Sequence, residues 1–97
     1  MKYFVYILYS QSKDKYYIGY TGNPEERVLE HNSGATTSTR HGIPWIMVYK
    51  EECEDKSAAI KRENKIKKMK SRKYIEKLIS ENSGGPDDPL ADVRMLI

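Results

Sequence analysis

Two apolar segments near the N-terminus predict a β-hairpin. Residues 3–9 are aromatic, β-branched or leucine at every position, which is typical of a buried strand. Residues 10–15 are polar and predict a turn, and residues 16–21 predict the second strand. Gly19 lies inside that second strand, where glycine usually marks a bulge or a close approach by another group.

Signals for a short helix follow the hairpin. Asn23 is a suitable N-cap, Pro24 suits the first helical position, and Glu26 completes a variant of the capping box. We expect this helix to end near Ser33, with Gly34 as its C-terminal stop.

A third strand is predicted over residues 45–50, after a loop over residues 35–42. Alternation within the strand places Trp45, Met47 and Tyr49 on one face. The three strands together predict a small, largely antiparallel sheet.

Two helices are predicted in the second half of the chain. The first spans about residues 56–70, and Ser71 caps a further, shorter helix. At 100° per residue the longer helix has one apolar side. That side is formed by Ala59, Ile60, Ile66 and Met69.

The predicted order β-β-α-β-α-α corresponds to an α+β domain, a three-stranded largely antiparallel sheet flanked by helices. The domain should occupy residues 1–82. Residues 83–97 contain a Gly-Gly-Pro-Asp-Asp-Pro run that cannot continue a helix, so we expect a flexible tail.

Composition limits the possible classes of protein. The chain has 97 residues, of which 38% are hydrophobic and 32% charged, enough for one domain with a modest core. It contains no apolar run of about 18 residues, so we expect no membrane-spanning helix and no membrane partner. Residues 1–4 lead into a strand rather than a signal peptide, and a cytoplasmic protein is the default expectation. Cys53 is the single cysteine, which excludes an intrachain disulfide.

The net charge of +3 is unevenly distributed. Residues 61–77 hold nine Lys or Arg and two Glu, a net charge of +7, while the rest of the chain carries −4. A localised basic stretch suggests a polyanion such as nucleic acid, although a solvated helix face is the alternative. The candidate nucleic-acid-binding residues are Lys61, Lys65, Lys67, Lys68, Lys70, Arg72 and Lys73.

Glu63 falls on the apolar side of the basic helix, where a carboxylate loses solvation and must be paired or bind a cation. One interpretation is a salt bridge to Arg27 or to a lysine of a neighbouring element. The other is an oxygen ligand for Mg²⁺ or Mn²⁺, because such ions often use only one or two protein carboxylates.

Arg27 and His31 are four residues apart and therefore share a face of their helix. A guanidinium can hold a phosphate, and a histidine can carry a proton near neutral pH. Two ordinary exposed polar residues are the alternative. Arg40 and His41, in the loop before the third strand, are weaker candidates for the same site.

Six of the eight tyrosines lie within the first 20 residues, and most are expected to be core or sheet-face residues. Tyr6 and Tyr17 lie on the same sheet face if the hairpin pairs residues whose numbers sum to 23 or 25. Their hydroxyl groups would then approach each other beside the space left by Gly19. The sequence alone does not determine this register.

These residues resemble the GIY-YIG nuclease superfamily, and more narrowly small bacterial proteins similar to the N-terminal catalytic domain of the UvrC excinuclease subunit. The resemblance covers about residues 3–80. It rests on the ordered set Val5-Tyr6-Ile7, Tyr17-Ile18-Gly19-Tyr20-Thr21, Arg27 with His31-Asn32 and Gly34, Pro44-Trp45, and Ala59, Glu63 and Ile66-Lys67. Phe4 stands where the family name has glycine, and Asn82 is the one nearby candidate for the family's late asparagine.

The resemblance implies metal-assisted hydrolysis of a DNA phosphodiester. Glu63 would bind a single Mg²⁺ or Mn²⁺, and Arg27 would stabilise the transition state. Either Tyr17 or His31 would take a proton from the attacking water, with Tyr6 positioning it. Because an ordinary phenol has a pKa of about 10, a tyrosine base needs help from the metal or from Arg27.

Three functions compete at this point. The first is a metal-dependent DNA endonuclease, structure-selective and linked to repair or recombination, with a protein partner for targeting. The second is a nucleic-acid-binding module with little or no catalysis, and the third is a protein-interaction domain. An inward carboxylate beside a phosphate favours the enzyme, because a module that only binds phosphate would gain repulsion from it.

Overall fold

The structure is a computed structural model, and it describes residues 2–82. The predicted order β-β-α-β-α-α is confirmed, with one short 3₁₀ helix, η1, added before the third strand. The tail predicted over residues 83–97 lies outside the described residues. The elements are β1 (Tyr3–Ser10), β2 (Lys15–Thr21), α1 (Pro24–Asn32), η1 (Arg40–Gly42), β3 (Trp45–Cys53), α2 (Lys56–Lys68) and α3 (Arg72–Asn82).

The sheet has the strand order β2-β1-β3, and both pairings are antiparallel. In the hairpin, Tyr6 pairs with Gly19 and Leu8 with Tyr17, so paired residue numbers sum to 25. This is one of the two registers for which the sequence predicts Tyr6 and Tyr17 on one face. It places Tyr6 of β1 and Tyr17 of the edge strand β2 on the same face of the sheet.

The prediction that Tyr49 shares a face with Trp45 and Met47 is wrong. Between the pairs Ile7–Tyr49 and Leu8–Met47 the register shifts by one residue, which leaves Val48 as an extra residue on β3. A bulge of this kind reverses the alternation of side chains beyond it. Trp45 and Met47 therefore pack with Tyr6, whereas Tyr49 packs on the opposite face.

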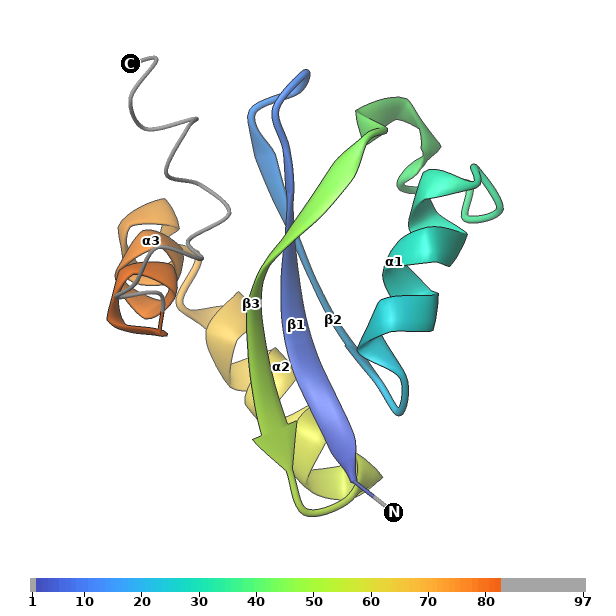
Figure 1. Ribbon diagram of the computed structural model, residues 1–97. Helices are drawn as coiled ribbons and strands as arrows, with labels where there is room; N and C mark the ends of the chain where they lie inside the picture. The colour runs from blue at the N-terminus through green and yellow to red at the C-terminus, as the bar shows by residue number, and fades with distance from the viewer. Residues whose placement is uncertain (1, 83–97) are drawn as a thin grey trace.

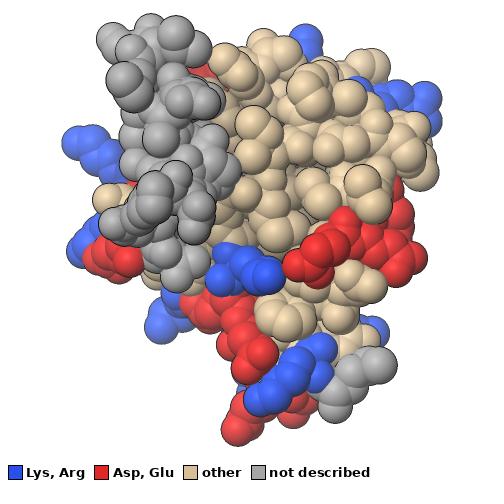
Figure 2. Space-filling view, in the orientation of Figure 1, with Lys and Arg blue, Asp and Glu red and all other residues tan. Residues whose placement is uncertain are grey.

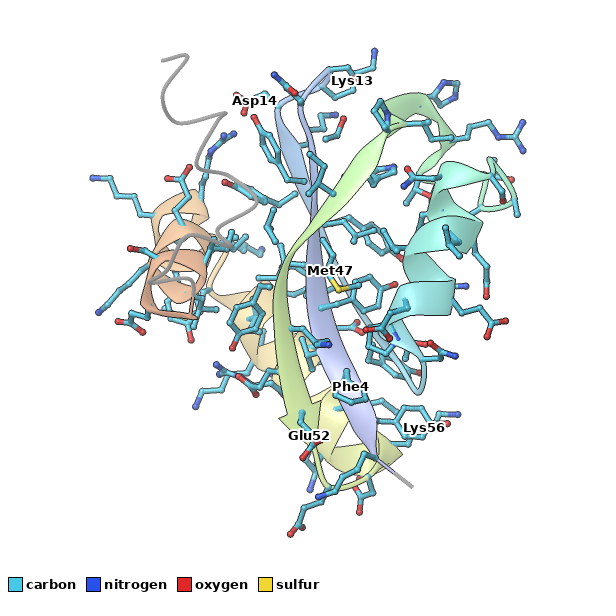
Figure 3. The ribbon with its side chains drawn as sticks, viewed as in Figure 1. Phe4, Lys13, Asp14, Met47, Glu52 and Lys56 are labelled. Atoms are coloured by element: carbon cyan, nitrogen blue, oxygen red, sulfur yellow. The ribbon has the colours of Figure 1, made fainter. Side chains whose placement is uncertain are left out.

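Helices cover both faces of the sheet, as Figure 1 shows. On one face, α1 packs over Tyr6, Leu8 and Trp45, and Met47 extends from β3 toward this helix (Figure 3). On the other face, α2 and α3 cover a core in which β1 contributes buried residues. Those residues are Val5, Ile7 and Tyr9 of β1, Ala59 and Ile66 of α2, and Ile79 of α3.

Local signals account for the helix boundaries. The Asn23 side chain accepts a hydrogen bond from the Glu26 backbone N–H, and Gly34 adopts φ +83°, as expected for a helix stop. Ser71 caps α3 by accepting from the Tyr74 N–H. The longer helix ends at Lys68, so Met69, predicted to be apolar-facing, is instead half exposed at its C-cap. Across the described residues no helix has the length and apolarity needed to span a membrane.

Candidate active site

A cavity of about 310 Å³ lies beside the edge strand β2. Four elements contribute polar side chains to it: Tyr6 comes from β1, Tyr17 from β2, Arg27 from α1 and Glu63 from α2. The structure therefore brings together four of the five residues predicted to carry the chemistry. We refer to this space as the edge cavity, lined by Tyr6, Tyr17, Ile18, Gly19, Tyr20, Arg27, Glu63 and Lys67.

Gly19 makes this arrangement of tyrosines possible. A β-carbon on Gly19 would lie 2.5 Å from the Tyr6 hydroxyl oxygen, so the Tyr6 ring occupies the space that a side chain would fill. The rings of Tyr6 and Tyr17 lie 6.4 Å apart. The glycine in the second strand is thus a close-approach position rather than a bulge.

His31 lies behind the cavity and does not line it. It is fully buried; its Nε2 is 3.0 Å from the Tyr6 hydroxyl and its Nδ1 2.8 Å from Thr39 Oγ1. The Thr39 hydroxyl donates to the Thr36 carbonyl at 3.4 Å, so its oxygen is left to accept from Nδ1–H. The network therefore assigns Nε2 as the acceptor for the Tyr6 hydroxyl proton.

The environments of Tyr6 and His31 keep both groups neutral. Burial raises the pKa of Tyr6 above its usual value, and the neighbouring Arg27 guanidinium opposes that rise. Burial, followed by the positive charge of Arg27, lowers the pKa of His31. A neutral imidazole with a free Nε2 lone pair is able to accept a proton from Tyr6.

Arg27 presents a charged group at the mouth of the site. Its Nη1 donates to Glu30 at 2.7 Å, and its side chain is one-third exposed. The contact with the Tyr6 hydroxyl raises the pKa of Arg27, so the guanidinium remains positive. A guanidinium that is one-third exposed beside an open cavity is accessible to a phosphate.

Glu63 is mostly buried, with a side chain 12% exposed, and is paired with Lys67 at 2.7 Å. The ion pair expected for this carboxylate is therefore present, but its partner is one turn later on the same helix. Among the described residues no three His, Cys, Asp or Glu side chains form a metal cage. One carboxylate on an open cavity does fit Mg²⁺ or Mn²⁺ that takes its other ligands from water and substrate phosphate.

The predicted basic residues do not share one surface. Lys67 lines the edge cavity, and Lys67, Lys70 and Arg72 line a neighbouring cavity. Helical geometry places Lys61, Lys65 and Lys68 on the side of α2 opposite Glu63, and Lys73 is exposed on α3. Over the described residues in Figure 2, basic groups stand apart between acidic and uncharged ones, so this face has no continuous basic patch.

The remaining candidates do not line the edge cavity. His41 lines a third cavity, of about 350 Å³, with Tyr17 and Trp45, whereas Arg40 is exposed and lines none of these spaces. Asn82 is the last residue of α3, and its role stays a prediction. Thr39 was missed by the sequence reasoning, because a threonine in a polar loop carries no signal until the fold places it against His31.

A model of the GIY-YIG catalytic domain matches residues 2–75 of the chain. The chain belongs to the GIY-YIG family. This membership confirms the resemblance predicted from the tyrosine, arginine and glutamate motifs, and it indicates a nuclease-type function.

Relatives of the GIY-YIG chain cover nearly its full described length. A UPF0213 protein from Natronomonas pharaonis is 40% identical over 82 residues, which is 84% of this chain and 94% of that protein. A UPF0213 protein from Staphylococcus saprophyticus is 39% identical, over 82% of this chain and 96% of its own. The solution NMR structure of a UPF0213 protein from Bacillus halodurans is similar with a TM-score of 0.57 at 32% identity, covering 94% and 95% of the two chains.

A more distant similarity concerns a named nuclease subunit. The structure-specific endonuclease subunit SLX1 homolog of Drosophila melanogaster is 45% identical over 56 residues. That match covers 47% of this chain and 18% of the fly protein.

Proposed function

We propose that this protein is a divalent-metal-dependent nuclease that hydrolyses DNA phosphodiester bonds and acts on branched or damaged DNA in repair or recombination. The observation that carries the proposal is the convergence of Tyr6, Tyr17, Arg27 and Glu63 on one open cavity. A phosphate entering this cavity would meet a guanidinium, a carboxylate and two phenols. Family membership and the similarity to a protein named as an endonuclease subunit support the same function.

Glu63 would hold the divalent ion in this reaction. When bound there, Mg²⁺ or Mn²⁺ would act as a Lewis acid on the phosphate. Lys67 neutralises Glu63 in the protein alone. In the complex, the same lysine has a substrate phosphate as an alternative partner, which would free the carboxylate to bind the ion.

Arg27 would stabilise the negative charge that develops on the phosphate oxygens. A preorganised cation aimed at the transition state commonly contributes about 3–4 kcal/mol, by analogy with a single oxyanion-hole donor. Arg27 is charged, one-third exposed and directed to the cavity that Glu63 lines, so both charges can act on the same phosphate.

Tyr6 and His31 would together accept the proton of the attacking water. Of the two bases suggested by the resemblance, His31 is fully buried with both nitrogens occupied, and so it does not reach water directly. In the tautomer assigned above, its Nε2 accepts a hydrogen bond from the Tyr6 hydroxyl. We therefore assign Tyr6 as the group that takes the proton of the water while its own proton passes to His31 Nε2. Tyr17, which lines the same cavity, would position the water.

The test is cleavage of single-stranded, duplex, flap and four-way-junction DNA with Mg²⁺, comparing wild type with Glu63→Gln. Metal-dependent nicking should fall by more than about a hundredfold in the variant, the usual effect of removing such a group. Glu54→Gln is the matched control, because Glu54 is an exposed carboxylate outside the cavity. It should cleave as the wild type does.

Two further outcomes would refute the proposal or its details. Absence of cleavage on every substrate, with salt-sensitive DNA binding by both proteins, would identify a nucleic-acid-binding module instead. Equal losses for Tyr6→Phe and Tyr17→Phe would refute the assignment of Tyr6 as the proton acceptor, because that assignment depends on the bond between the Tyr6 hydroxyl and His31 Nε2.

A further inference from the structure

The residue that follows α2 has an unusual backbone conformation for its type. Lys70 adopts φ +45°, in the left-handed region, directly after the C-cap Met69. Glycine is the usual residue at this position, because a β-carbon is strained there. A non-glycine residue held in such a conformation suggests that the side chain is retained for a function.

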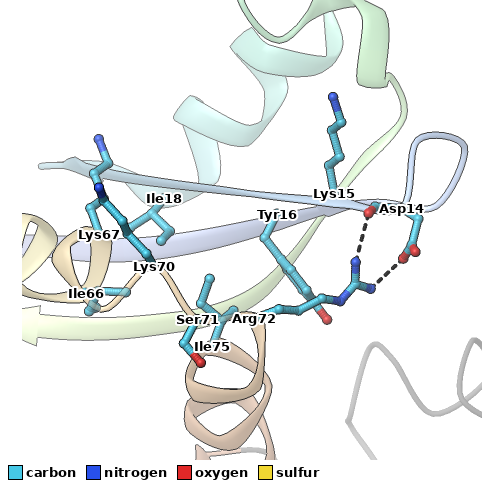
Figure 4. A pocket seen from close by; sticks show the side chains of 10 residues that line it. All are labelled: Asp14, Lys15, Tyr16, Ile18, Ile66, Lys67, Lys70, Ser71, Arg72 and Ile75. Atoms are coloured by element: carbon cyan, nitrogen blue, oxygen red, sulfur yellow. Dashed lines mark hydrogen bonds and ion pairs between the residues drawn. The ribbon is translucent and has the colours of Figure 1, made fainter.

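The Lys70 side chain lines a cavity of about 390 Å³ between β2 and the junction of α2 and α3 (Figure 4). The cavity has two kinds of lining. Ile18, Ile66 and Ile75 form an apolar floor, and Lys67 and Lys70 contribute cationic side chains. Figure 4 shows Lys67 and Lys70 at one end of this space and Arg72, bonded to Asp14, at the other.

This basic cavity adjoins the edge cavity. Ile18 and Lys67 line both spaces, so a strand bound at Glu63 and Arg27 has its neighbouring nucleotide within reach of the basic cavity. Both cavities lie along β2, which is an edge strand of the sheet.

We propose that the basic cavity binds an unpaired nucleotide that flanks the scissile phosphate, with its base on the isoleucine floor and its phosphate at Lys67 and Lys70. The apolar floor is the reason for choosing an unpaired nucleotide over a duplex backbone. A duplex offers only phosphates and sugars to such a surface, whereas an unstacked base can cover apolar side chains. The inference rests on the proposed nuclease function and assigns its substrate class, a strand with unpaired nucleotides beside the cut.

The test measures binding in EDTA, where no cleavage occurs. The probe is a fluorescein-labelled oligo(dT) of about twelve nucleotides, within the site sizes of single-strand modules. Oligo(U) and a blunt duplex of the same length are compared with it by anisotropy. We expect oligo(dT) and oligo(U) each to bind more tightly than the duplex. Tighter binding of oligo(dT) would identify deoxyribose as the preferred sugar, and tighter binding of oligo(U) would identify ribose. Replacing one internal nucleotide by an abasic residue should weaken binding.

Lys70→Gly separates the ligand role from a structural one. The variant should bind oligo(dT) about three- to tenfold more weakly, with the salt slope reduced by about 0.7, as for the loss of one phosphate contact. It should also melt about 4–8 °C higher, because glycine relieves the left-handed strain. Lys77→Gln is the matched control for charge, since Lys77 is exposed on α3, outside the cavity. It should bind within about twofold of wild type.

Three results would overturn the inference. These are equal binding of duplex and single strand, no effect of the abasic residue, and equal affinities for Lys70→Gly and Lys77→Gln. Because binding is measured without metal, the result of this assay can be told apart from the result of the cleavage test. Strand binding that depends on Lys70, without any cleavage, would refute the nuclease and support the cavity. Cleavage by the wild type, together with unchanged oligo(dT) binding by Lys70→Gly, would support the nuclease and refute the nucleotide site in the basic cavity.

Discussion

Replacing Gly19 by alanine tests whether this glycine is required to admit the Tyr6 ring. The added β-carbon would lie 2.5 Å from the Tyr6 hydroxyl oxygen and 2.6 Å from Cζ. Ordinary contacts of this kind are about 3.5 Å, so the ring must move by about 1 Å. Tyr6 is 1% exposed and bonded to His31, so it cannot move freely. We expect the free energy of unfolding to fall by about 1–3 kcal/mol, the usual cost of overpacking.

The assay is urea unfolding, followed by cleavage at a concentration where the variant is folded. Gly22→Ala is the matched control, because its β-carbon would meet the Tyr3 ring at 3.7 Å, an ordinary contact. It should change stability by less than about 0.5 kcal/mol. Cleavage by Gly19→Ala should be reduced even when the protein is folded, because the displaced hydroxyl no longer bonds to His31.

A double-mutant cycle decides whether the Tyr6 contact causes the loss. Tyr6→Leu removes the atoms that the new β-carbon would strike. In that background Gly19→Ala should cost at least about 1 kcal/mol less than in the wild type. An equal cost in both backgrounds would refute the reasoning, because the destabilisation would then come from β2 itself.

Two further predictions concern stability. The pKa of His31 is lower in the folded protein than in the unfolded chain. The stabilisation that neutral His31 provides is therefore fully present above about pH 6.5. It is lost as the pH falls, because the unfolded chain binds the proton at a higher pH than the folded protein does. Between pH 7.5 and 5.5 the free energy of unfolding of the wild type, measured in urea, should fall by up to about 1.4 kcal/mol per pH unit. The same plot for His31→Gln should have a shallower slope. Parallel slopes for the two proteins would contradict this prediction. Arg62 Nε lies 3.2 and 3.0 Å from the two Glu51 carboxylate oxygens in a partly buried pair. Arg62→Ala should therefore lower the free energy of unfolding by about 1.5–3 kcal/mol. Lys2→Ala, which breaks the exposed pair with Glu52, should lower it by less than about 1 kcal/mol. Similar thermal shifts for these two variants would refute the role assigned to burial.

Local patterns determined most of the secondary structure. The hairpin, the capped helix α1 and the apolar side of α2 all depend on residues within a few positions of one another, where propensity and periodicity act directly. Alternation also indicated which hairpin registers would place Tyr6 and Tyr17 on one face, but it did not determine the register itself. The motif residues identified the family because their types and order are properties of the sequence.

Only the tertiary structure decided how these parts combine. The extra residue Val48 moved Tyr49 to the opposite face, because the bulge depends on pairing with β1 rather than on β3 alone. The hydrogen-bond partner of His31 Nδ1 is Thr39, which comes from a loop with no periodicity. The cavity that joins Tyr6, Arg27 and Glu63 depends on two helices packed against opposite faces of one edge strand. Such contacts join residues far apart in the chain, so their geometry is set by packing of the whole domain and not by any local pattern.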